Sequence, residues 1–399
     1  MERSNHNLPP SRDQIWRDMV TIEGGDPSIR EGEGFAIGGE GRGGEGGEGR
    51  RKGVVTGVGS SGGVRCKTVN ATCHASEKQA LMDFKKDLKD PYGRLSSWIH
   101  DVDCCKWKGV VCSNRSGRVI QLHLQSPAND EVFADPKSPL SGNISHSLQN
   151  LTHLCYLDLS LNNFSGIPIP SFFGSLRSLS SSLPSEVFTL KDLISLDTSN
   201  NHLNGPIPST IGNCTKLKQL FLNHNALSGS IPSNLGKLSS LENWDVSHNK
   251  LTGTLPESLW QLSKLEVLCI YNNLMEGIVS ESQLDNLTSL TFFDPSENSF
   301  TLKVSANWTP RAQFNILGLS SWKLGPQFPT WIQSQKILRN LNLSFTGISD
   351  TIPTWLFNPS LDSVDLSRNQ LHDKSSMISE IVKGLYVHSS QTYSMAYSH

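Results

Sequence analysis

Residues 217–232 read LKQLFLNHNALSGSIP, and residues 241–256 repeat the same phrase as LENWDVSHNKLTGTLP. An asparagine in this phrase returns at one fixed spacing, at Asn201, Asn225, Asn249 and Asn273. A fixed period of this length is typical of a solenoid, in which each repeat forms one turn and packs only against its neighbours. The chain is therefore expected to fold as a row of stacked turns.

The spacing inside each repeat predicts one short strand per turn. The form L-x-x-L-x-L-x-x-N-x-L is that of leucine-rich repeats. Leu220 and Leu222 then point inward, and Asn225 follows the strand, where its side chain can hydrogen-bond the backbone of neighbouring turns. The expected fold class for residues 119–371 is an α/β leucine-rich-repeat solenoid of about ten repeats. It would have a curved parallel β-sheet and a convex side of mostly 3-10 helices and loops.

The period is broken at one place. The step from Asn162 to Asn201 is clearly shorter than the two full periods that would separate them in an unbroken array. Residues 176–190 keep the tail of a repeat but lack its strand and its asparagine. We interpret this segment as a deletion and expect a local fault in the solenoid there.

Later repeats keep the period with other residues. Trp322 and Thr346 take the asparagine position one period apart, and Asn369 follows. Pro295 replaces an inward leucine and is expected to weaken the pairing of its strand, because proline has no N–H to donate.

Composition excludes several classes of function. The net charge is −2 and the pI near 6.6, so no overall field favours nucleic acid or an anionic membrane. No run approaches the ~20 apolar residues of a membrane span. No P-loop, G-x-S-x-G or H-E-x-x-H pattern occurs, and neither a cofactor nor a metal ion is expected.

The two ends carry no repeat. Residues 1–65 are rich in Gly, Glu and Arg and are expected to be disordered. A formal G-x-G-x-x-G at Gly41, Gly43 and Gly46 has no strand before it, so a flexible tail is favoured over a dinucleotide site. Residues 372–399 are an unpatterned tail.

Features that indicate location point in two directions. Residues 1–25 lack the apolar stretch of a secretory signal, which suggests an altered N-terminus. Nine Asn-x-Ser/Thr acceptor sites instead favour a secreted protein. They are Asn70, Asn114, Asn143, Asn150, Asn163, Asn213, Asn286, Asn307 and Asn342.

Residues 66–118 are expected to form an N-terminal cap that covers the open end of the solenoid. Ser76 and Gln79 have the spacing of a capping box that opens a short helix, and Asp90-Pro91 would stop it. Four cysteines follow the pattern of a disulfide framework whose pairing the sequence alone leaves open, with zinc as the rival interpretation. They are Cys73, Cys104, Cys105 and Cys112.

The run CHASEKQALMDFKKDLKDPYGRLSSWIHDVDCCKWKGVVC, Cys73–Cys112, is similar to the N-terminal cap of plant extracellular leucine-rich-repeat proteins. Residues 73–371 resemble plant receptor-like proteins, and Asn315–Trp355 resembles the fungal-xylanase-receptor subgroup. The resemblance implies the disulfides Cys73–Cys104 and Cys105–Cys112, and a second short strand at the G-x-I-P segment. Three further cysteines are expected as buried thiols of the repeat core, namely Cys155, Cys214 and Cys269.

The candidate ligand-binding residues lie between the inward leucines and would face the concave side. They are Gln219, Phe221, Asn223, His224, Asn243, Asp245, Ser247, His248, Val267 and Tyr271. Phe221 and Tyr271 are expected to be exposed aromatic anchors. His224 and His248 would stack near Asp245, but repeat duplication explains their spacing better than acid–base catalysis or metal binding.

The resemblance implies a non-catalytic recognition ectodomain at the plant cell surface, acting in defence signalling. Its partners would be a protein, peptide or glycan ligand and a co-receptor kinase. Relatives of this kind continue into further repeats and a membrane helix that this sequence lacks, so a truncated form is expected. The alternatives are a secreted inhibitor of microbial cell-wall-degrading enzymes, similar to polygalacturonase inhibitors, a fragment of a receptor kinase, and a non-functional truncated product.

Overall fold

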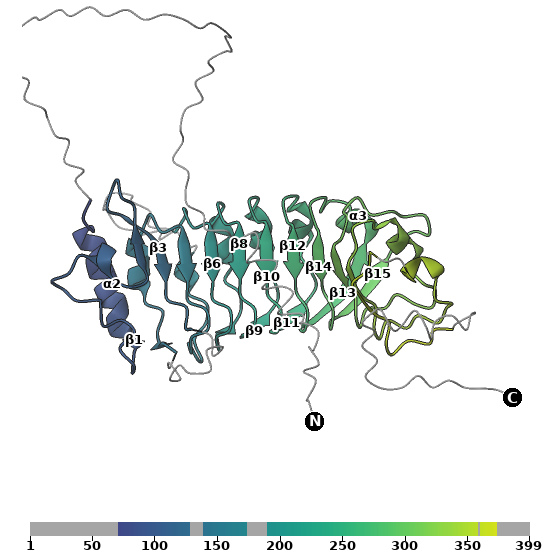
Figure 1. Cartoon of the computed structure of the whole chain (residues 1–399), viewed down its shortest axis with the longest axis horizontal. Helices are drawn as coiled ribbons and strands as arrows, with labels where there is room; N and C mark the ends of the chain where they lie inside the picture. The colour runs from purple at the N-terminus through teal and green to yellow at the C-terminus, as the bar shows by residue number, and fades with distance from the viewer. Residues whose placement is uncertain (1–70, 128–138, 174–189, 358–359, 373–399) are drawn as a thin grey trace, which may run out of the picture. The chain divides into compact units, whose positions relative to one another are not determined.

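Parallel turns stack side by side through the repeat region, which confirms the predicted solenoid (Figure 1). The computed structural model describes residues 71–127, 139–173, 190–357 and 360–372. Their large sheet has 11 strands, of which all but β2 are parallel. In spatial order these are β2 (Val110–Cys112), β3 (Val119–His123), β5 (Tyr156–Asp158), β6 (Ser195–Asp197), β8 (Gln219–Phe221), β10 (Asn243–Asp245), β12 (Val267–Cys269), β14 (Phe292–Asp294), β16 (Ile316–Gly318), β17 (Asn340–Asn342) and β18 (Ser363–Asp365).

A second sheet of five parallel strands runs along the solenoid. Its strands are β7 (Asn204–Gly205), β9 (Ala226–Gly229), β11 (Lys250–Gly253), β13 (Leu274–Ser280) and β15 (Ser299–Lys303). The second strand that the resemblance implied is thus present, but it ends at Gly229 and does not include the rest of the G-x-I-P segment. Pro232 instead caps a 3-10 helix.

Short helices complete the turns. The 3-10 helices of the repeats are η2 (His146–Asn150), η3 (Ser171–Phe173), η4 (Ser209–Asn213), η5 (Ser233–Lys237), η6 (Glu257–Gln261), η7 (Thr330–Ser334) and η8 (Thr354–Phe357), and one turn has the α-helix α3 (Glu281–Leu284).

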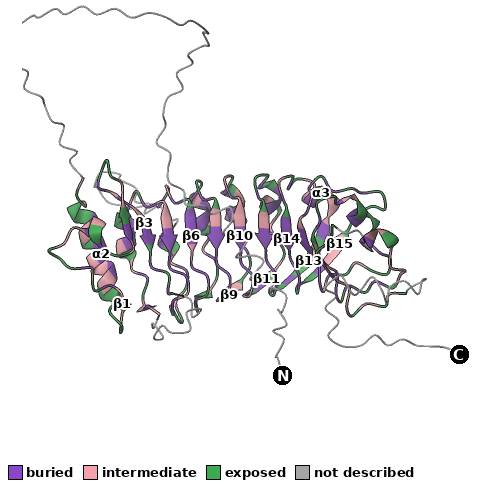
Figure 2. Cartoon of the chain, viewed as in Figure 1, coloured by how far each residue is buried: buried purple, intermediate pink, exposed green. Residues whose placement is uncertain are grey.

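Buried residues recur on the strands of the large sheet from turn to turn (Figure 2), and their apolar side chains join one hydrophobic core. At the middle position of four successive strands, Leu196, Leu220, Trp244 and Leu268 are all 0% exposed. Each buried side chain of this kind contributes about 1.5–3 kcal/mol. Since a turn cannot bury its own leucines, this energy becomes available only when neighbours stack.

The repeating asparagine connects adjacent turns. The Asn249 side-chain amide donates to the carbonyl oxygens of Val246 and Ser247 in its own turn, at 3.0 and 3.1 Å. It also donates to Leu222 O of the preceding turn at 3.0 Å, and its Oδ1 accepts from Leu227 N at 2.9 Å. The predicted hydrogen bonding to neighbouring turns is therefore confirmed.

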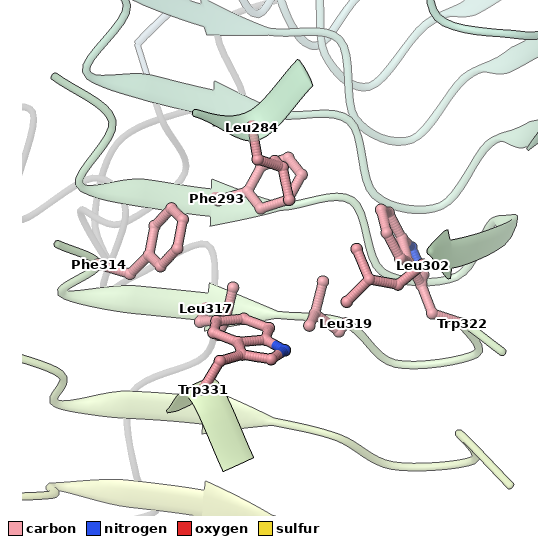
Figure 3. A pocket seen from close by; sticks show the side chains of 8 residues that line it. All are labelled: Leu284, Phe293, Leu302, Phe314, Leu317, Leu319, Trp322 and Trp331. Carbon is pink, nitrogen blue, oxygen red and sulfur yellow. The ribbon is translucent and has the colours of Figure 1, made fainter. Parts of the chain in front are cut away.

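Trp322 and Thr346 each reproduce part of this pattern. Trp322 Nε1 donates to Pro295 O at 3.1 Å, which is the bond to the preceding turn. Thr346 Oγ1 donates to Leu343 O at 2.9 Å, which is a bond within its own turn. Figure 3 shows Trp322 beside Leu302, in an apolar space that Phe293 and Phe314 also line. The indole thus adds apolar packing to the hydrogen bond that it keeps.

The sequence predicted two irregular places, at Pro295 and at residues 176–190, and they differ in their effect on the large sheet. Strand β14, which Pro295 follows, pairs with β12 through three residue pairs but with β16 through only two. The predicted weakening of this strand's pairing is therefore confirmed. The predicted fault near residues 176–190 does not reach the large sheet. Strands β5 and β6 pair in register across the shortened step, with no strand between them. Residues 174–189 themselves lie outside the described part.

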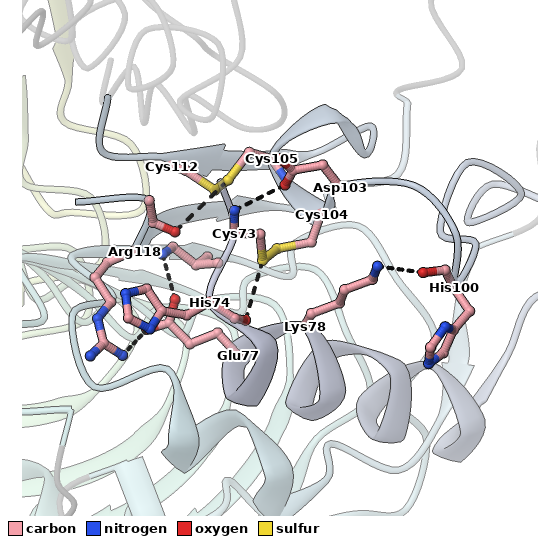
Figure 4. Close-up of a disulfide and its surroundings, with 12 residues drawn as sticks. Cys73, His74, Glu77, Lys78, His100, Asp103, Cys104, Cys105, Cys112 and Arg118 are labelled. Atoms are coloured by element: carbon pink, nitrogen blue, oxygen red, sulfur yellow. Dashed lines mark hydrogen bonds and ion pairs between the residues drawn. A yellow bond between two sulfur atoms is a disulfide. The ribbon is translucent and has the colours of Figure 1, made fainter. Parts of the chain in front are cut away.

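The cap packs helix α2 (Ala75–Asp87) against the first turns. The predicted disulfides Cys73–Cys104 and Cys105–Cys112 are present (Figure 4). Asp103, which precedes the 3-10 helix η1 (Cys104–Lys106), accepts hydrogen bonds from Cys73 N and Cys105 N at 3.1 and 3.0 Å. The two bridges are therefore held by one carboxylate, and their sulfurs are not available to zinc.

The predicted capping box at Ser76 is wrong. Helix α2 begins two residues earlier than that box requires, at Ala75 and not Glu77, and its N-cap residue His74 makes no side-chain capping bond. Gln79 instead donates to Asp83 Oδ1 at 3.0 Å, one helical turn later. The helix ends before Asp90, because strand β1 (Leu88–Lys89) pairs with β4 (Ser141–Gly142) of the first repeat.

A buried carboxylate joins the cap to the solenoid. Glu77 is 0% exposed, and its Oε2 accepts from Val119 N, the first residue of β3, at 2.8 Å. Its other oxygen lies 3.4 Å from the Arg118 guanidinium. A buried carboxylate needs such partners, so this contact fixes the helix against the first strand.

Replacing Asn249 by alanine should lower the free energy of unfolding by on the order of 3–5 kcal/mol, because several buried backbone groups lose their partners. Asn243→Ala is the control, since Asn243 is only partly buried on the sheet and should cost less than about 1 kcal/mol. Urea unfolding followed by tryptophan fluorescence measures both. Equal losses would contradict the role assigned to Asn249.

Removing either disulfide should destabilise the cap. The bridges close loops with sequence separations of 31 and 7 residues. Chain entropy then predicts losses of roughly 4 kcal/mol for a Cys73→Ser/Cys104→Ser pair and roughly 2.5 kcal/mol for Cys105→Ser/Cys112→Ser. Hydrogen exchange of α2 amides reports the loss locally. If the chain is expressed with a secretion signal and mass spectrometry then finds all four thiols free, the pairing is refuted.

Candidate ligand-binding surface

The candidate surface is the outer face of the large sheet, which we call the sheet face. It is made by the first and last residue of each three-residue strand and by the second and third residues after it, because the first residue after each strand (Leu222, Val246 or Ile270) points into the core. Gln219, Asn243 and Val267 are paired in register as the first residues of β8, β10 and β12. All ten predicted ligand-binding residues lie on these three adjacent strands or directly after them. The sequence therefore placed them together correctly, while ligand contact stays a prediction.

Phe221 and Tyr271 are not the exposed anchors that we predicted. They are 6% and 8% exposed, although neither belongs to the hydrophobic core. Paired strands lie about 4.8 Å apart, so side chains at one register position cover each other across the sheet. The period predicts the side on which a residue lies, but its exposure depends on these neighbours.

Two histidines and a tyrosine form a stack on the sheet face. The His224 and His248 rings lie 4.1 Å apart at 22°, and Tyr271 meets His248 edge-on at 4.7 Å. His248 Nε2 lies 3.1 Å from the Tyr271 hydroxyl, and Nδ1 lies 2.5 Å from the Asn272 amide nitrogen. The predicted stacking is confirmed, and it gives the face a rigid aromatic element.

A backbone feature missed by the sequence reasoning orients these histidines. The residue before each asparagine position has positive φ, with values of 53° at His224 and 51° at His248. Asn and His adopt this conformation more often than most residues do. The same position holds Asn200, Asn272 and Phe345, the last with 62% exposure.

Carboxylates on the sheet face close the strand ends. Asp245 Oδ1 accepts from Ser247 N at 2.8 Å, and Asp158 Oδ1 accepts from both Ser160 N and Ser160 Oγ at 2.9 and 2.7 Å. The same Asp/Asn-x-Ser pattern occurs in further turns. Asp245 and Ser247 are only 2% and 1% exposed, so their role is to close the end of the strand. The Asp-x-Ser spacing in the sequence already indicates this role.

Asp197 has an unusual titration. It is the register partner of Asp158 on the neighbouring strand. Burial, and then the Asp158 charge, raise the pKa of Asp197 to about 7. The same burial, with Asp158 and Asp197 nearby, raises the pKa of Tyr156. Two carboxylates side by side on a sheet repel each other, so one of them keeps its proton.

Two of the three cysteines expected as buried thiols are buried and unbridged, Cys214 and Cys269, each 1% exposed, but only Cys214 lies in the hydrophobic core. Cys214 is 1% exposed within the hydrophobic core, and burial raises its pKa to about 12. Cys269 is the last residue of β12 and lies on the sheet face, and the half-buried Cys155 precedes β5. Counting from the asparagine would have placed both correctly, because they occupy non-leucine positions.

Further residues extend the face toward the C-terminal strands. Phe292 and Ile316 continue the register of Val267 and are 7% and 9% exposed, outside the core. At Gly318 an added Cβ would lie 2.1 Å from Asp294 Oδ1, so glycine leaves room for that carboxylate. The less regular sequence of these repeats hid this apolar stretch from the sequence reasoning.

Most of the predicted glycosylation sites are accessible. Asn114, Asn143, Asn150, Asn163, Asn286 and Asn307 are exposed, and Asn213 is partly buried. Asn342 lies within β17, where its Oδ1 accepts from Ser344 N at 2.9 Å, so its side chain is already engaged. Asn70 lies outside the described residues. Glycan attachment at all of them stays a prediction.

Among the described residues, no helix has the length and apolar character needed to cross a membrane. The one group there with metal-ligand spacing, Cys73, Asp103, Cys104 and Cys105, consists of the bridged cap cysteines and their carboxylate. The sheet face instead offers amides, hydroxyls and aromatic rings, which suit hydrogen bonding and stacking.

Comparison with known proteins agrees with this geometry. Residues 137–352 match the family model described as a leucine-rich repeat region, and residues 74–113 match the leucine-rich repeat N-terminal domain. The receptor-like protein EIX2 of Solanum lycopersicum is 43% identical over 118 residues, which cover 29% of this chain and 12% of that protein.

Two solved Arabidopsis thaliana ectodomains share the fold. The receptor kinase GASSHO1/SCHENGEN3, solved with CASPARIAN STRIP INTEGRITY FACTOR 2, has a TM-score of 0.59 and 29% identity, covering 73% of this chain and 33% of that chain. The receptor kinase HAESA, solved with an IDA peptide hormone, has a TM-score of 0.57 and 27% identity, covering 74% and 49%. This chain thus spans less than half the length of either.

Replacing Asp197 by asparagine should remove a pH dependence of stability. The folded pKa of Asp197 lies near 7, above its usual 3.8, so the folded chain binds the extra proton between these values. The free energy of unfolding therefore falls as pH rises from about 4 to 7. The amide of the Asp197→Asn variant would keep the bond from Ser199 N, now 2.8 Å. Asp197 is still partly exposed, and solvent screens its charge. We therefore expect the free energy of unfolding of the parent chain to fall by only about 1 kcal/mol between pH 4 and 7.

Urea unfolding between pH 4.5 and 8 measures the effect. Asp158→Asn should weaken it as well, because it removes the neighbouring charge that raises the pKa of Asp197. Identical pH profiles for the parent chain and Asp197→Asn would refute the shared-proton interpretation.

Proposed function

Because the chain belongs to the leucine-rich-repeat family, with plant receptor-like proteins among its relatives, we propose that it is a recognition ectodomain that binds a peptide on its sheet face. It acts by binding and not by catalysis. A location at the plant cell surface, a role in defence and a co-receptor kinase as partner belong to the same proposal and rest on the resemblance alone.

The observation that carries the proposal is the register of β8, β10 and β12. It sets Gln219, Asn243 and Val267 in one row, and His224 and His248 in another. Side chains in a row repeat at the strand separation of about 4.8 Å, so a peptide that crosses the strands meets one side chain of each row on every strand. All five are partly buried, so they are positioned by neighbours and still reach solvent.

The chemistry of the face favours a peptide over a small molecule. Amide groups of Gln219 and Asn243 offer donors and acceptors to a peptide backbone, and the histidine stack offers an aromatic surface. Both structural relatives described above were solved with peptide or protein factors, which supports this class of ligand. These relatives are longer than this chain, so the peptide contacts proposed here concern only the repeats that it contains.

We expect peptides selected from a random displayed library against the secreted full chain to depend on the sheet face. His248→Asn removes the ring yet suits the positive φ, as Asn272 at the equivalent position shows. This variant and Asn243→Ala should each weaken binding about tenfold, or about 1.4 kcal/mol. Thr252→Ala is the control, since Thr252 is exposed on strand β11 of the second sheet.

Titration calorimetry or surface plasmon resonance gives the affinities. Peptides that lose affinity with Thr252→Ala but not with the two sheet-face variants would refute the proposed surface. Failure to select any peptide, together with inhibition of a microbial polygalacturonase by the chain, would instead favour the inhibitor.

A further inference from the structure

A groove lies away from the sheet face, between the loop before β16 and helix η7. Its volume is about 330 Å³, at the lower end of the range for small-molecule sites. It is lined by Ala306, Asn307, Trp308, Thr309, Thr330, Trp331, Gln333 and Ser334. None of these residues belongs to the sheet face, so the proposed ligand site does not account for the groove.

Two tryptophans make its base. Trp308 and Trp331 are each 7% exposed, and their rings meet edge-on at 5.1 Å. Trp308 Nε1 donates to Asp285 Oδ1 at 3.1 Å, which fixes that ring against the preceding turn. The base is therefore rigid and largely apolar.

Polar groups make its rim. Thr309, Thr330 and Gln333 are exposed, and Ser334 Oγ donates to Trp331 O at 2.7 Å. Hydroxyl and amide groups around an apolar base match a sugar ring, which has hydroxyls at its edge and C–H groups on its faces. The groove thus suits one or two sugar residues in chemistry and in size.

One lining residue can carry that sugar covalently. Asn307, Trp308 and Thr309 form an Asn-x-Thr acceptor site, and Asn307 is exposed. We propose that an N-linked glycan is attached to Asn307 and that its first N-acetylglucosamine residues are seated in this groove. Attachment at the groove's own wall keeps the sugar at a high local concentration, so weak contacts suffice to hold it.

The attachment step needs a lipid-linked oligosaccharide diphosphate as donor and the secretory oligosaccharyltransferase. The Asn307 amide nitrogen forms a bond to the anomeric carbon C1 of the sugar, and the C1–O bond to phosphate breaks. The lipid diphosphate leaves with the bonding electrons, and one amide proton passes to a base of the transferase. Because attachment precedes folding, the seated position is reached when the turn around η7 closes.

The inference rests on secretion, which is part of the proposed function, but not on peptide binding. Asn286 is a matched internal control, since it is also an exposed acceptor site but does not line the groove. Fusing the full chain to a heterologous secretion signal removes the dependence on its natural location. If the glycan test fails in that system, the proposed peptide binding is not affected. If peptide binding fails, the glycan proposal is not affected.

The test compares cleavage by endoglycosidase H, which cuts between the first two N-acetylglucosamines, in a host that adds only high-mannose glycans. Glycopeptide mass spectrometry follows each site in time. On the folded chain we expect cleavage at Asn307 to be about tenfold slower than at Asn286, because a seated sugar must first leave the groove. After denaturation the two rates should be equal.

Gln333→Trp should fill the groove without disturbing the core, because Gln333 is exposed. This variant should bring the native cleavage rate at Asn307 close to that at Asn286 while leaving Asn286 unchanged. An unoccupied Asn307, equal native rates at the two sites, or protection that survives Gln333→Trp would each overturn the proposal.

Discussion

The hydrogen bonds of the repeating asparagine are the constraint on which the solenoid depends. Each turn bends sharply after its strand and leaves backbone groups that no regular ladder pairs. Asn225 satisfies four of them, from Leu203 N in the preceding turn to the carbonyls of Thr198, Leu222 and Asn223. One asparagine side chain bonds backbone groups of two turns, so a turn reaches its final conformation only when its neighbour is in place. This coupling aligns the inward leucines and the strand register from turn to turn.

The sequence predicted this framework well because the framework is periodic. Counting from Asn201 located the strands, and it identified Trp322 and Thr346 as replacements whose indole and hydroxyl keep part of the hydrogen bonding. The cap disulfides followed from resemblance, not from spacing. The capping box at Ser76 failed because Ser76 already lies inside the helix and Gln79 bonds Asp83. The bond from Val119 N to Glu77, which a local motif does not contain, holds this end of the helix against the first strand.

The surface was harder to predict than the fold. The period gave the side on which Phe221 and Tyr271 lie, but their burial depends on contacts between turns that are a full period apart in the sequence. Asp245 looked like a recognition residue, yet its carboxylate is engaged by Ser247 at the strand end. Polar residues on such a sheet therefore divide into those that close the turn and those that face solvent. The Asp-x-Ser spacing identifies the residues that close the turn, and it can be recognised in the sequence.

The in-register pairing of β5 and β6 has a consequence for how such chains change over generations. The shortened step between Asn162 and Asn201 leaves the strand pairs Tyr156–Ser195 and Asp158–Asp197 in place. Unequal recombination between repeated gene segments can thus delete part of a turn while the rows of the sheet face remain aligned. Selection can then act on surface residues one row at a time, because the register of neighbouring strands is kept although the length of the chain between them changes.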